Sequence, residues 1–145
     1  MIVVSDATPL IGLAKIGKLE LLRELFDTIR IPEAVYAEVV TDARERPGAL
    51  EIRQAEWIIT QSPLDQTKVA YLRADLDAGE AEALVLVEEL SADWILLDET
   101  KARLAADLLG FRYIGTIGLL LLAKRIGWLE RVGPLIDELR IKKFY

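Results

Sequence analysis

The chain of 145 residues contains no histidine and no cysteine. Without histidine, a Ser-His-Asp triad, a histidine general base and a histidine-ligated zinc are all excluded. Without cysteine, disulfides and thiolate metal sites are excluded as well, which suits a reducing cytoplasm. Any hydrolytic chemistry must therefore come from carboxylates, hydroxyls, lysines or a hard metal ion that is bound by oxygen ligands.

Long hydrophobic runs are also absent. The most apolar stretch, residues 117–123, is far shorter than the ~20 residues that a helix needs to cross a bilayer. The first residues lack the basic segment and apolar core of a signal peptide. The net charge of −6 argues against broad nonspecific binding of nucleic acid. We predict a single globular domain over residues 1–145, located in the cytoplasm and not bound to a membrane.

Short apolar runs alternate with helical stretches along the chain. Thr8-Pro9 is predicted to open the first helix as N-cap and first helical residue, Pro32 and Gly79 lie where later helices start, and Gly110 closes another. Continuously apolar strands that alternate with helices indicate a parallel sheet covered on both faces. The runs that predict strands are 2–4, 28–31, 57–60, 94–97 and 112–114.

Two acids follow predicted strands directly: Asp6 after residues 2–4 and Asp98 after residues 94–97. Ligands of parallel sheets gather at the carboxyl ends of the strands. If these strands are neighbours, the two backbones lie ~4.8 Å apart, and the carboxylates repel each other unless a cation or a shared proton intervenes. Helix capping explains either residue equally well when it is taken alone. Thr8 is the better cap, which leaves Asp6 without a structural role.

Two glutamates lie on predicted helices. Glu80 heads the apolar stripe of the helix that starts at Gly79, where an unpaired carboxylate is costly, whereas Glu82 and Glu89 are predicted to point into solvent. The alternative for Glu80 is that it favours the helix N-terminus and reaches water at the edge. Glu38 borders the apolar ridge of the helix after Pro32, and an exposed helix-flank glutamate is the commoner explanation for it alone.

Further polar groups end the later strands. Glu99 and Thr116 are interpreted either as support for neighbouring ligands or as helix caps. Mg²⁺ prefers oxygen ligands and is usually held by one or two carboxylates plus waters. Phosphodiester hydrolysis needs a positioned, metal-activated water and cationic charge. Carboxylates alone can build such a site, in agreement with the lack of histidine.

The ordered combination of these segments resembles the PIN-domain family. Asp6 within Val-Val-Ser-Asp-Ala-Thr-Pro-Leu-Ile matches the start of PIN domains, and Glu38 matches the helix-borne glutamate of the family. The segments 76–84, 96–99, Ala102-Arg103, 115–118 and 121–124 resemble a PIN-like branch of uncharacterised bacterial and archaeal proteins, which is related to the toxins of toxin–antitoxin pairs. The resemblance covers most of the chain.

The resemblance implies a three-layer α/β/α sandwich with a central, mainly parallel sheet of about five strands. It also implies a ribonuclease site that depends on Mg²⁺ or Mn²⁺. Glu80 stands where many PIN domains carry Asp, and at the fourth acidic position Asp98-Glu99 replaces a Thr-x-Asn/Asp arrangement, so the ligand at that position is either Asp98 or Glu99. The implied catalytic acids are Asp6, Glu38, Glu80 and Asp98; the metal ligands are Asp6, Glu80 and Asp98; the supporting residues are Thr8, Glu99 and Thr116.

The leading hypothesis is a toxin-type ribonuclease with an RNA substrate, a small antitoxin partner and a homodimeric state. Basic side chains near the cleft would contact the phosphates, with Arg44, Arg46, Lys101 and Arg103 as candidates. The alternative is a catalytically silent PIN fold that serves as a protein-interaction module. Residues 119–122 are apolar all around a helix and are therefore expected to be buried on two sides, in the core or at a subunit interface. A phosphatase or receiver-like protein ranks last, because Thr8 stands where Asp-x-Asp needs its second Asp.

Overall fold

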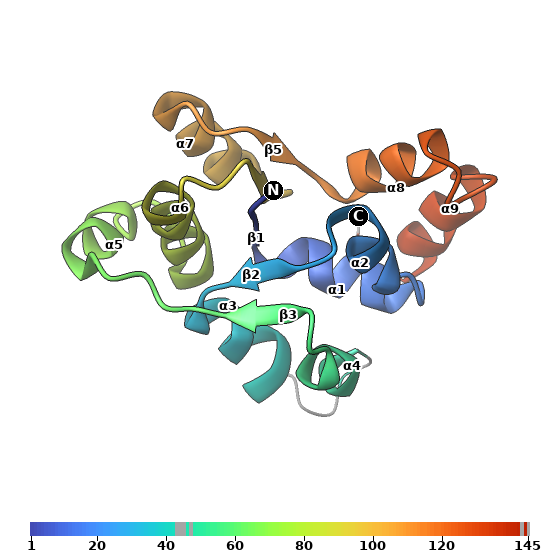
Figure 1. Ribbon diagram of the computed structural model, residues 1–145, viewed down its shortest axis with the longest axis horizontal. Helices are drawn as coiled ribbons and strands as arrows, with labels where there is room; N and C mark the ends of the chain where they lie inside the picture. Colours follow the sequence, from blue (N-terminus) through green and yellow to red (C-terminus); the bar gives the residue numbers. More distant parts are fainter. Residues whose placement is uncertain (43–45, 47, 143, 145) are drawn as a thin grey trace.

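The computed structural model describes residues 1–42, 46, 48–142 and 144. Five parallel strands form one sheet in the order β3-β2-β1-β4-β5 (Figure 1). All five predicted strands are confirmed: β1 has the predicted length but lies one residue later, and the other four are each one residue shorter than their apolar runs. The strands are β1 (Val3–Ser5), β2 (Ile29–Ile31), β3 (Ile58–Thr60), β4 (Trp94–Leu96) and β5 (Tyr113–Ile114).

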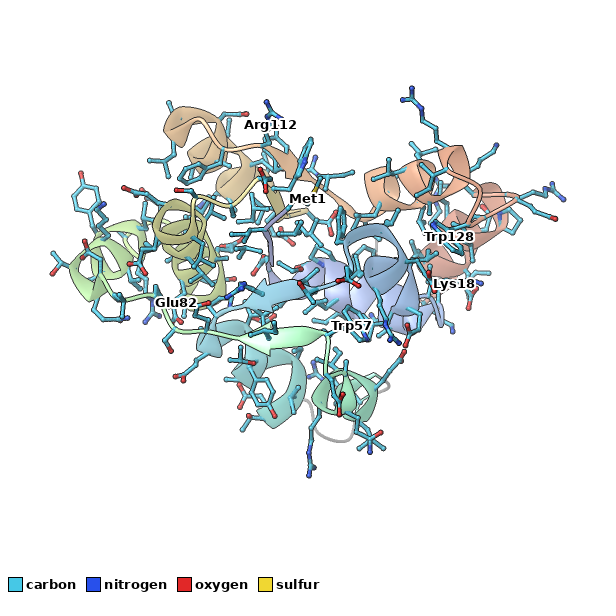
Figure 2. All side chains as sticks on the ribbon, viewed as in Figure 1. Met1, Lys18, Trp57, Glu82, Arg112 and Trp128 are labelled. Atoms are coloured by element: carbon cyan, nitrogen blue, oxygen red, sulfur yellow. The ribbon has the colours of Figure 1, made fainter. Side chains whose placement is uncertain are left out.

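Helices connect the strands and cover both faces of the sheet, as parallel pairing requires. Figure 2 shows the side chains on these elements, with Trp57 just before β3 and Trp128 in the turn after α8. The described helices are α1 (Ala7–Lys15), α2 (Glu20–Phe26), α3 (Glu33–Tyr36), the π-helical turn η1 (Ala37–Thr41), α4 (Ala49–Gln54), α5 (Gln66–Leu72), α6 (Ala78–Leu90), α7 (Thr100–Leu109), α8 (Thr116–Arg125) and α9 (Gly133–Ile141).

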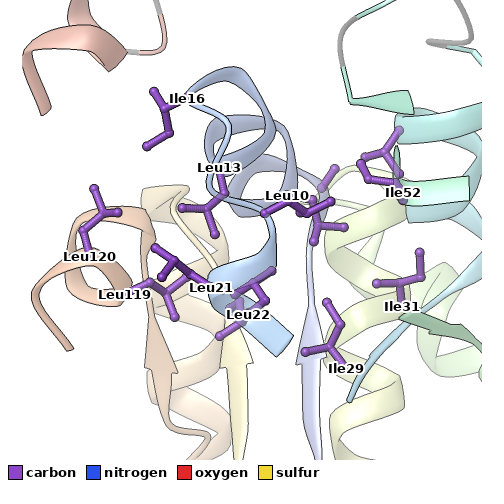
Figure 3. Packing of buried hydrophobic residues seen from close by; sticks show 14 of the residues in the cluster. Leu10, Leu13, Ile16, Leu21, Leu22, Ile29, Ile31, Ile52, Leu119 and Leu120 are labelled. Atoms are coloured by element: carbon purple, nitrogen blue, oxygen red, sulfur yellow. The ribbon is translucent and has the colours of Figure 1, made fainter. Parts of the chain in front are cut away.

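Two separate apolar clusters lie on opposite faces of the sheet. Consecutive residues of β1 divide between them, because side chains of a strand alternate in direction. Val3 packs in the larger cluster with residues of α1, α2 and α8, which Figure 3 shows from close by. Val4 packs in the other cluster with residues of α6 and α7. The predicted three-layer α/β/α architecture is therefore confirmed.

Helix boundaries were predicted less accurately than strands. Gly110 closes α7 in the left-handed conformation, with φ of 79°, as predicted. The prediction of Thr8 as N-cap is wrong, because α1 starts at Ala7 and Asp6 occupies the N-cap position. Helix α6 starts at Ala78, one residue earlier than predicted.

The leucine-rich segment of α8 is buried on one side only. Leu119 and Leu120 are almost completely buried, whereas the side chain of Leu121 is 53% exposed. The core therefore accounts for the burial of Leu119 and Leu120, and the alternative of a subunit interface that covers Leu121 stays a prediction. No helix within the described residues is long and apolar enough to cross a membrane.

Candidate functional site

Asp6 lies at the carboxyl end of β1, in the middle of the sheet. Its backbone N–H donates to the carbonyl of Leu96 at 3.0 Å, so the ends of β1 and β4 are joined at this point. Only 3% of Asp6 is exposed. Although Asp6 is the N-cap residue of α1, its carboxylate does not make the usual side-chain cap hydrogen bond to that helix; only the backbone amide of Ala7 acts on it. The usual capping contact therefore does not explain the buried carboxylate.

The first turn of α6 brings two further acids towards Asp6. Glu80 and Asp77 form a reciprocal capping box: the Glu80 N–H donates to Asp77 Oδ1 at 2.8 Å, and the Asp77 N–H donates to Glu80 Oε1 at 3.0 Å. Between them, Gly79 has no side chain, and a Cβ there would lie 3.3 Å from Asp6 Oδ1. The glycine thus allows the helix N-terminus to approach the Asp6 carboxylate closely.

Glu38 is presented by η1, which continues directly from α3. Helix α3 packs against α6, and the Ala34 N–H donates at 3.3 Å to Oε1 of Glu82, the residue labelled in Figure 2. Glu82 is therefore half-buried against α3, and the prediction that it points into solvent is wrong. This contact fixes the segment carrying Glu38 next to the start of α6, although the Glu38 side chain itself is exposed.

The charges around Asp6 are those of other carboxylates. The pKa of Asp6 is raised to about 8, chiefly by burial; the carboxylates of Asp77, Glu80 and Glu38 contribute in the same direction, while the backbone amide of Ala7 lowers it. The desolvation of a carboxylate and the approach of like charges both favour its protonated form. The site therefore gathers carboxylates around a poorly hydrated carboxyl group, whose charged form is disfavoured unless a cation is present.

The pKa values of Glu38 and Glu80 are raised by the same two causes, loss of hydration and nearby carboxylates. Partial loss of hydration raises the pKa of Glu38, with Asp77 and Glu80 adding to the shift and Arg46 lowering it. Burial raises the pKa of Glu80, and the charges of Asp77 and Glu99 act in the same direction. We refer to Asp6, Glu38, Asp77, Glu80 and Glu99 as the acidic cluster.

Asp98 follows β4, but its carboxylate is bound elsewhere. Oδ1 accepts the N–H of Thr116 at 2.8 Å, and Oδ2 accepts the Thr116 hydroxyl at 2.6 Å. Oδ1 also lies 3.8 Å from Nη2 of Arg103. The structure thus joins Asp98 to the start of α8 and to α7. The sequence left open whether Asp98 or Glu99 is the ligand at this position. In the structure it is the charge of Glu99 that helps to raise the pKa of Glu80.

The other predicted residues occupy different positions around this edge. Thr8 is half-buried in the first turn of α1, and Lys101 is exposed on α7. Arg46 is exposed and close enough to Glu38 to lower its pKa. Arg44 lies outside the described residues. The roles assigned to these side chains stay predictions.

Sequence reasoning missed Asp77 as a member of the acidic cluster. The signal was present as Asp77-Ala78-Gly79-Glu80, an acid three residues before a glutamate at the start of an apolar helix, which is the spacing of a capping box. Placing the helix start at Gly79 hid it. Because Glu80 is part of the capping box, its position at the helix start does not by itself separate a capping role from a functional role.

The donor set suits a hard divalent cation, because it consists of carboxylate oxygens around a poorly hydrated Asp6. Within the described part of the chain, no three acidic side chains are already arranged as a cage for a metal ion. This is compatible with Mg²⁺ or Mn²⁺, which is commonly held by one or two carboxylates and several waters rather than by an all-protein cage. Asp6 and Glu80 are the buried acids that would serve.

Comparison with known proteins agrees with this architecture. The model of a protein family described as "DUF3368: PIN domain" matches residues 2–145, nearly the whole chain. None of the curated proteins matches the chain.

Proposed function

The chain belongs to the PIN-domain family, whose members are generally nucleases, and we propose that it is a metal-dependent endoribonuclease. The observation that carries the proposal is Asp6, a buried carboxylate at the end of β1 whose strongest charged neighbours are carboxylates of η1 and α6. Such an arrangement stores repulsion that a divalent cation relieves. PIN domains typically use divalent metals, and the donor chemistry of this site suits Mg²⁺ or Mn²⁺.

In the proposed mechanism, the carboxylates of Asp6 and Glu80 would hold the ion. When bound, the ion would activate water and supply positive charge to offset negative charge on the phosphate oxygens. Glu38, which is exposed, would orient the attacking water or serve as a further ligand, and Asp77 keeps the Glu80 side chain in place through the capping box. Asp98 was predicted as a third ligand; since both of its oxygens accept from Thr116, we propose that it acts at the border of the site.

The proposed biological setting is a toxin that cleaves RNA in the cytoplasm and is held inactive by a small antitoxin protein. A homodimer is part of the same proposal. These assignments extend the resemblance to toxin–antitoxin nucleases, and the acidic net charge of −6 requires that RNA be drawn to the site by local features rather than by the field of the whole chain.

Calorimetric titration with Mn²⁺ tests the proposal when RNA cleavage is assayed on the same samples. We expect the unaltered chain to bind Mn²⁺ and cut RNA, and Asp6→Asn to lose both. Glu24→Gln is the matched control, because it is the same replacement of a carboxyl by an amide at an exposed position, on α2. Lack of Mn²⁺ binding by the unaltered chain at millimolar concentrations would contradict the proposal.

The interaction-module alternative is favoured by one observation, an apolar groove of about 490 Å³ between α5 and α6. Tyr71, Leu84, Val85 and Leu109 contribute to its lining, and Tyr71 is strongly exposed. Grooves of this size and polarity are common binding sites. Light scattering on the unaltered chain and on Tyr71→Glu tests this alternative: a stable assembly that Tyr71→Glu dissociates, formed by a chain without metal affinity, would favour it over the nuclease.

A further inference from the structure

A cavity of about 380 Å³ lies beside the acidic cluster, between α7, β5 and the start of α8. We call it the Arg103 pocket, and its lining includes Asp98, Arg103, Tyr113, Gly115, Ile117 and Gly118. Its volume lies within the range of pockets that hold small ligands. Because Asp98 follows β4 and Asp6 follows β1, and these strands are paired in parallel, the pocket and the acidic cluster open at the same end of the sheet.

The guanidinium of Arg103 is held in place on three sides. Its Nε donates to the carbonyl of Leu97 at 3.0 Å, its Nη2 lies 3.8 Å from Asp98 Oδ1, and its Cζ lies 5.2 Å from the centroid of the Tyr113 ring. The side chain remains 36% exposed. A guanidinium has five N–H donors, so donors remain for a ligand after these contacts are made. The arginine is therefore positioned in advance.

Glycine keeps the pocket open. A Cβ at residue 115 would collide with the Arg103 guanidinium and would come within 2.6 Å of Asp98 Oδ1. A Cβ at residue 118 would come within 2.8 Å of Ile114 Cγ1. Neither glycine has a positive φ, so close approach, and not backbone conformation, explains the lack of a side chain at both positions.

The chemistry of the lining selects a class of ligand. A fixed guanidinium binds phosphate oxygens with paired hydrogen bonds, and the flat surfaces of arginine and of apolar or aromatic side chains accept a nucleobase. The negative charge of Asp98 opposes a phosphate, but its carboxylate already accepts two hydrogen bonds from Thr116 and faces the Arg103 cation. The pocket thus combines a cation, a ring and an apolar wall.

From these contacts we infer that the Arg103 pocket binds one nucleotide of the single-stranded RNA substrate, with its phosphate on Arg103 and its base against the wall formed with Ile117. The inference rests on the proposed nuclease function for the identity of the strand. It gives a chain with a net charge of −6 a local means of holding RNA next to its acidic cluster.

The test measures binding apart from cleavage. The affinity of a fluorescent single-stranded oligoribonucleotide is determined by anisotropy in the Asp6→Asn background, where the RNA stays intact. Arg103→Met, which keeps the stem and removes the charge, is expected to raise Kd about tenfold and to reduce the slope of log Kd against log salt by about 0.7. Arg112→Met is the matched control. Arg112, which is labelled in Figure 2, also lies over an aromatic ring, with its Cζ 5.9 Å from the centroid of Trp94, but it does not line the pocket.

A second pair of variants keeps the inference testable if Arg103→Met does not fold. Ile117→Asp adds a negative charge to the pocket at an exposed position, and Leu121→Asp adds the same charge one turn further along α8, also at an exposed position. Only Ile117→Asp is expected to weaken oligonucleotide binding. Equal effects within either pair, or an unchanged Kd for both Arg103→Met and Ile117→Asp, would overturn the inference.

The test of the Arg103 pocket and the test of the nuclease function can fail independently of each other. Mn²⁺ affinity and RNA cleavage by the unaltered chain, combined with no loss of binding in Arg103→Met, would retain the nuclease and overturn the pocket. Loss of oligonucleotide binding in Arg103→Met, in a chain that neither binds Mn²⁺ nor cuts RNA, would retain the pocket and overturn the nuclease.

Discussion

Asp98 accepts two hydrogen bonds from one residue, Thr116, whose backbone N–H and hydroxyl lie 2.8 and 2.6 Å from its two carboxylate oxygens. Thr116 is completely buried at the first position of α8. The pair therefore connects the end of β4 to the start of α8 across 18 residues of chain, and it fixes the carboxylate that faces Arg103.

Thr116→Val is expected to lower the free energy of unfolding by about 2 kcal/mol. The substitution preserves shape but leaves Asp98 Oδ2 without its hydroxyl donor, and hydrogen bonds to charged groups contribute about 1.5–3 kcal/mol. Urea unfolding measures the change, with Thr100→Val, an exposed position on α7, as the control. If the two variants lose the same stability, the hydrogen bond from the Thr116 hydroxyl to Asp98 contributes nothing specific.

Substitutions of Glu80 separate its capping role from its proposed metal-binding role. Glu80→Gln keeps an oxygen that accepts the Asp77 N–H, so the capping box survives, and it removes a carboxylate whose pKa is raised by burial. Stability at neutral pH should therefore not fall, whereas Mn²⁺ affinity should fall about tenfold or more, the loss typical of disturbed metal-site groups. Glu80→Ala should lose about 1 kcal/mol of stability as well, because the cap is broken.

The control for Glu80 is Glu88→Gln on the same helix, where the carboxylate is exposed and paired with Lys68 at 2.7 Å. Calorimetry with Mn²⁺ and urea unfolding are measured on all three variants. Mn²⁺ affinity that is equal in Glu80→Gln and in the unaltered chain would show that Glu80 is a capping residue and not a ligand.

The strands and the three layers could be predicted from the sequence because a short run of consecutive apolar residues fits a strand whose two faces are both covered by helices. Val3 and Val4, neighbours in sequence, pack into different clusters, and a short β-branched run is what such a strand needs. The position of Asp6 followed from the same reasoning, since it comes directly after the run.

The surroundings of the predicted acids could not be predicted in the same way. Asp98 and Glu99 are adjacent in sequence, yet one is bound to Thr116 and the other acts on Glu80. Asp98 is held by hydrogen bonds to Thr116, which lies 18 residues further along the chain, and no local pattern encodes that contact. The same limit applies to Glu82, whose partner Ala34 is 48 residues away.

The stability of the metal-free protein should decrease as pH rises from about 4 to about 8. The folded state holds a proton on Asp6 up to its pKa of about 8, whereas an unfolded Asp releases it near 3.9. Between these values the folded state binds more protons, so stability falls with pH, by at most about 1.4 kcal/mol per unit for one proton. The raised pKa values of Glu38 and Glu80 act in the same direction.

Urea unfolding in the presence of a chelator, repeated across this pH range, tests the dependence. Asp6→Asn should flatten the profile, since the amide does not titrate. Adding Mn²⁺ should stabilise the unaltered chain more at pH 8 than at pH 5, because binding requires the deprotonated carboxylate. A metal-free profile that stays level or rises between these pH values would mean that Asp6 is charged and well solvated in the folded protein.

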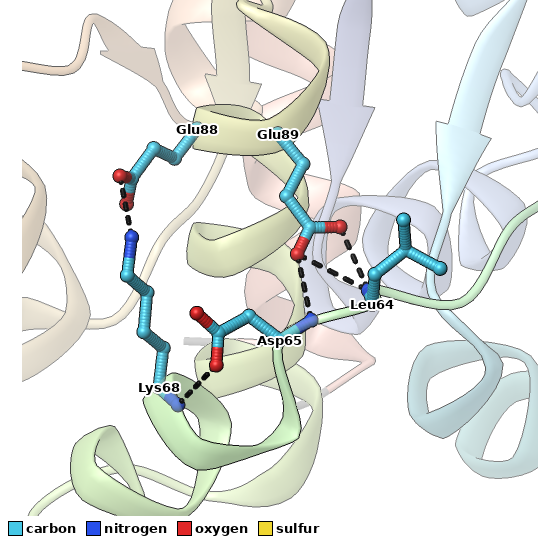
Figure 4. A network of polar contacts seen from close by, with 5 residues as sticks. All are labelled: Leu64, Asp65, Lys68, Glu88 and Glu89. Carbon is cyan, nitrogen blue, oxygen red and sulfur yellow. Dashed lines mark hydrogen bonds and ion pairs between the residues drawn. The ribbon is translucent and has the colours of Figure 1, made fainter.

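A different set of acids serves structure alone, and it provides the last prediction. Glu89 is exposed, as predicted, and its carboxylate accepts the N–H of Leu64 at 2.8 Å and of Asp65 at 2.9 Å (Figure 4). Asp65 in turn caps α5 by accepting the N–H of Lys68 at 3.0 Å, and Lys68 pairs with Glu88. Glu89 therefore holds the loop before α5 against α6.

Glu89→Ala should increase hydrogen exchange at the amides of Leu64 and Asp65 about tenfold, the factor expected when a hydrogen bond worth ~1.4 kcal/mol is lost. Because Glu89 is exposed, global stability should change little, and Mn²⁺ affinity should not change, since the residue lies at the opposite end of α6 from Glu80. Glu51→Ala, an exposed acid on α4, is the control for the loss of one charge. Exchange rates at Leu64 and Asp65 that match those of the control would show that the carboxylate is solvated and that the loop is held by its apolar contacts instead.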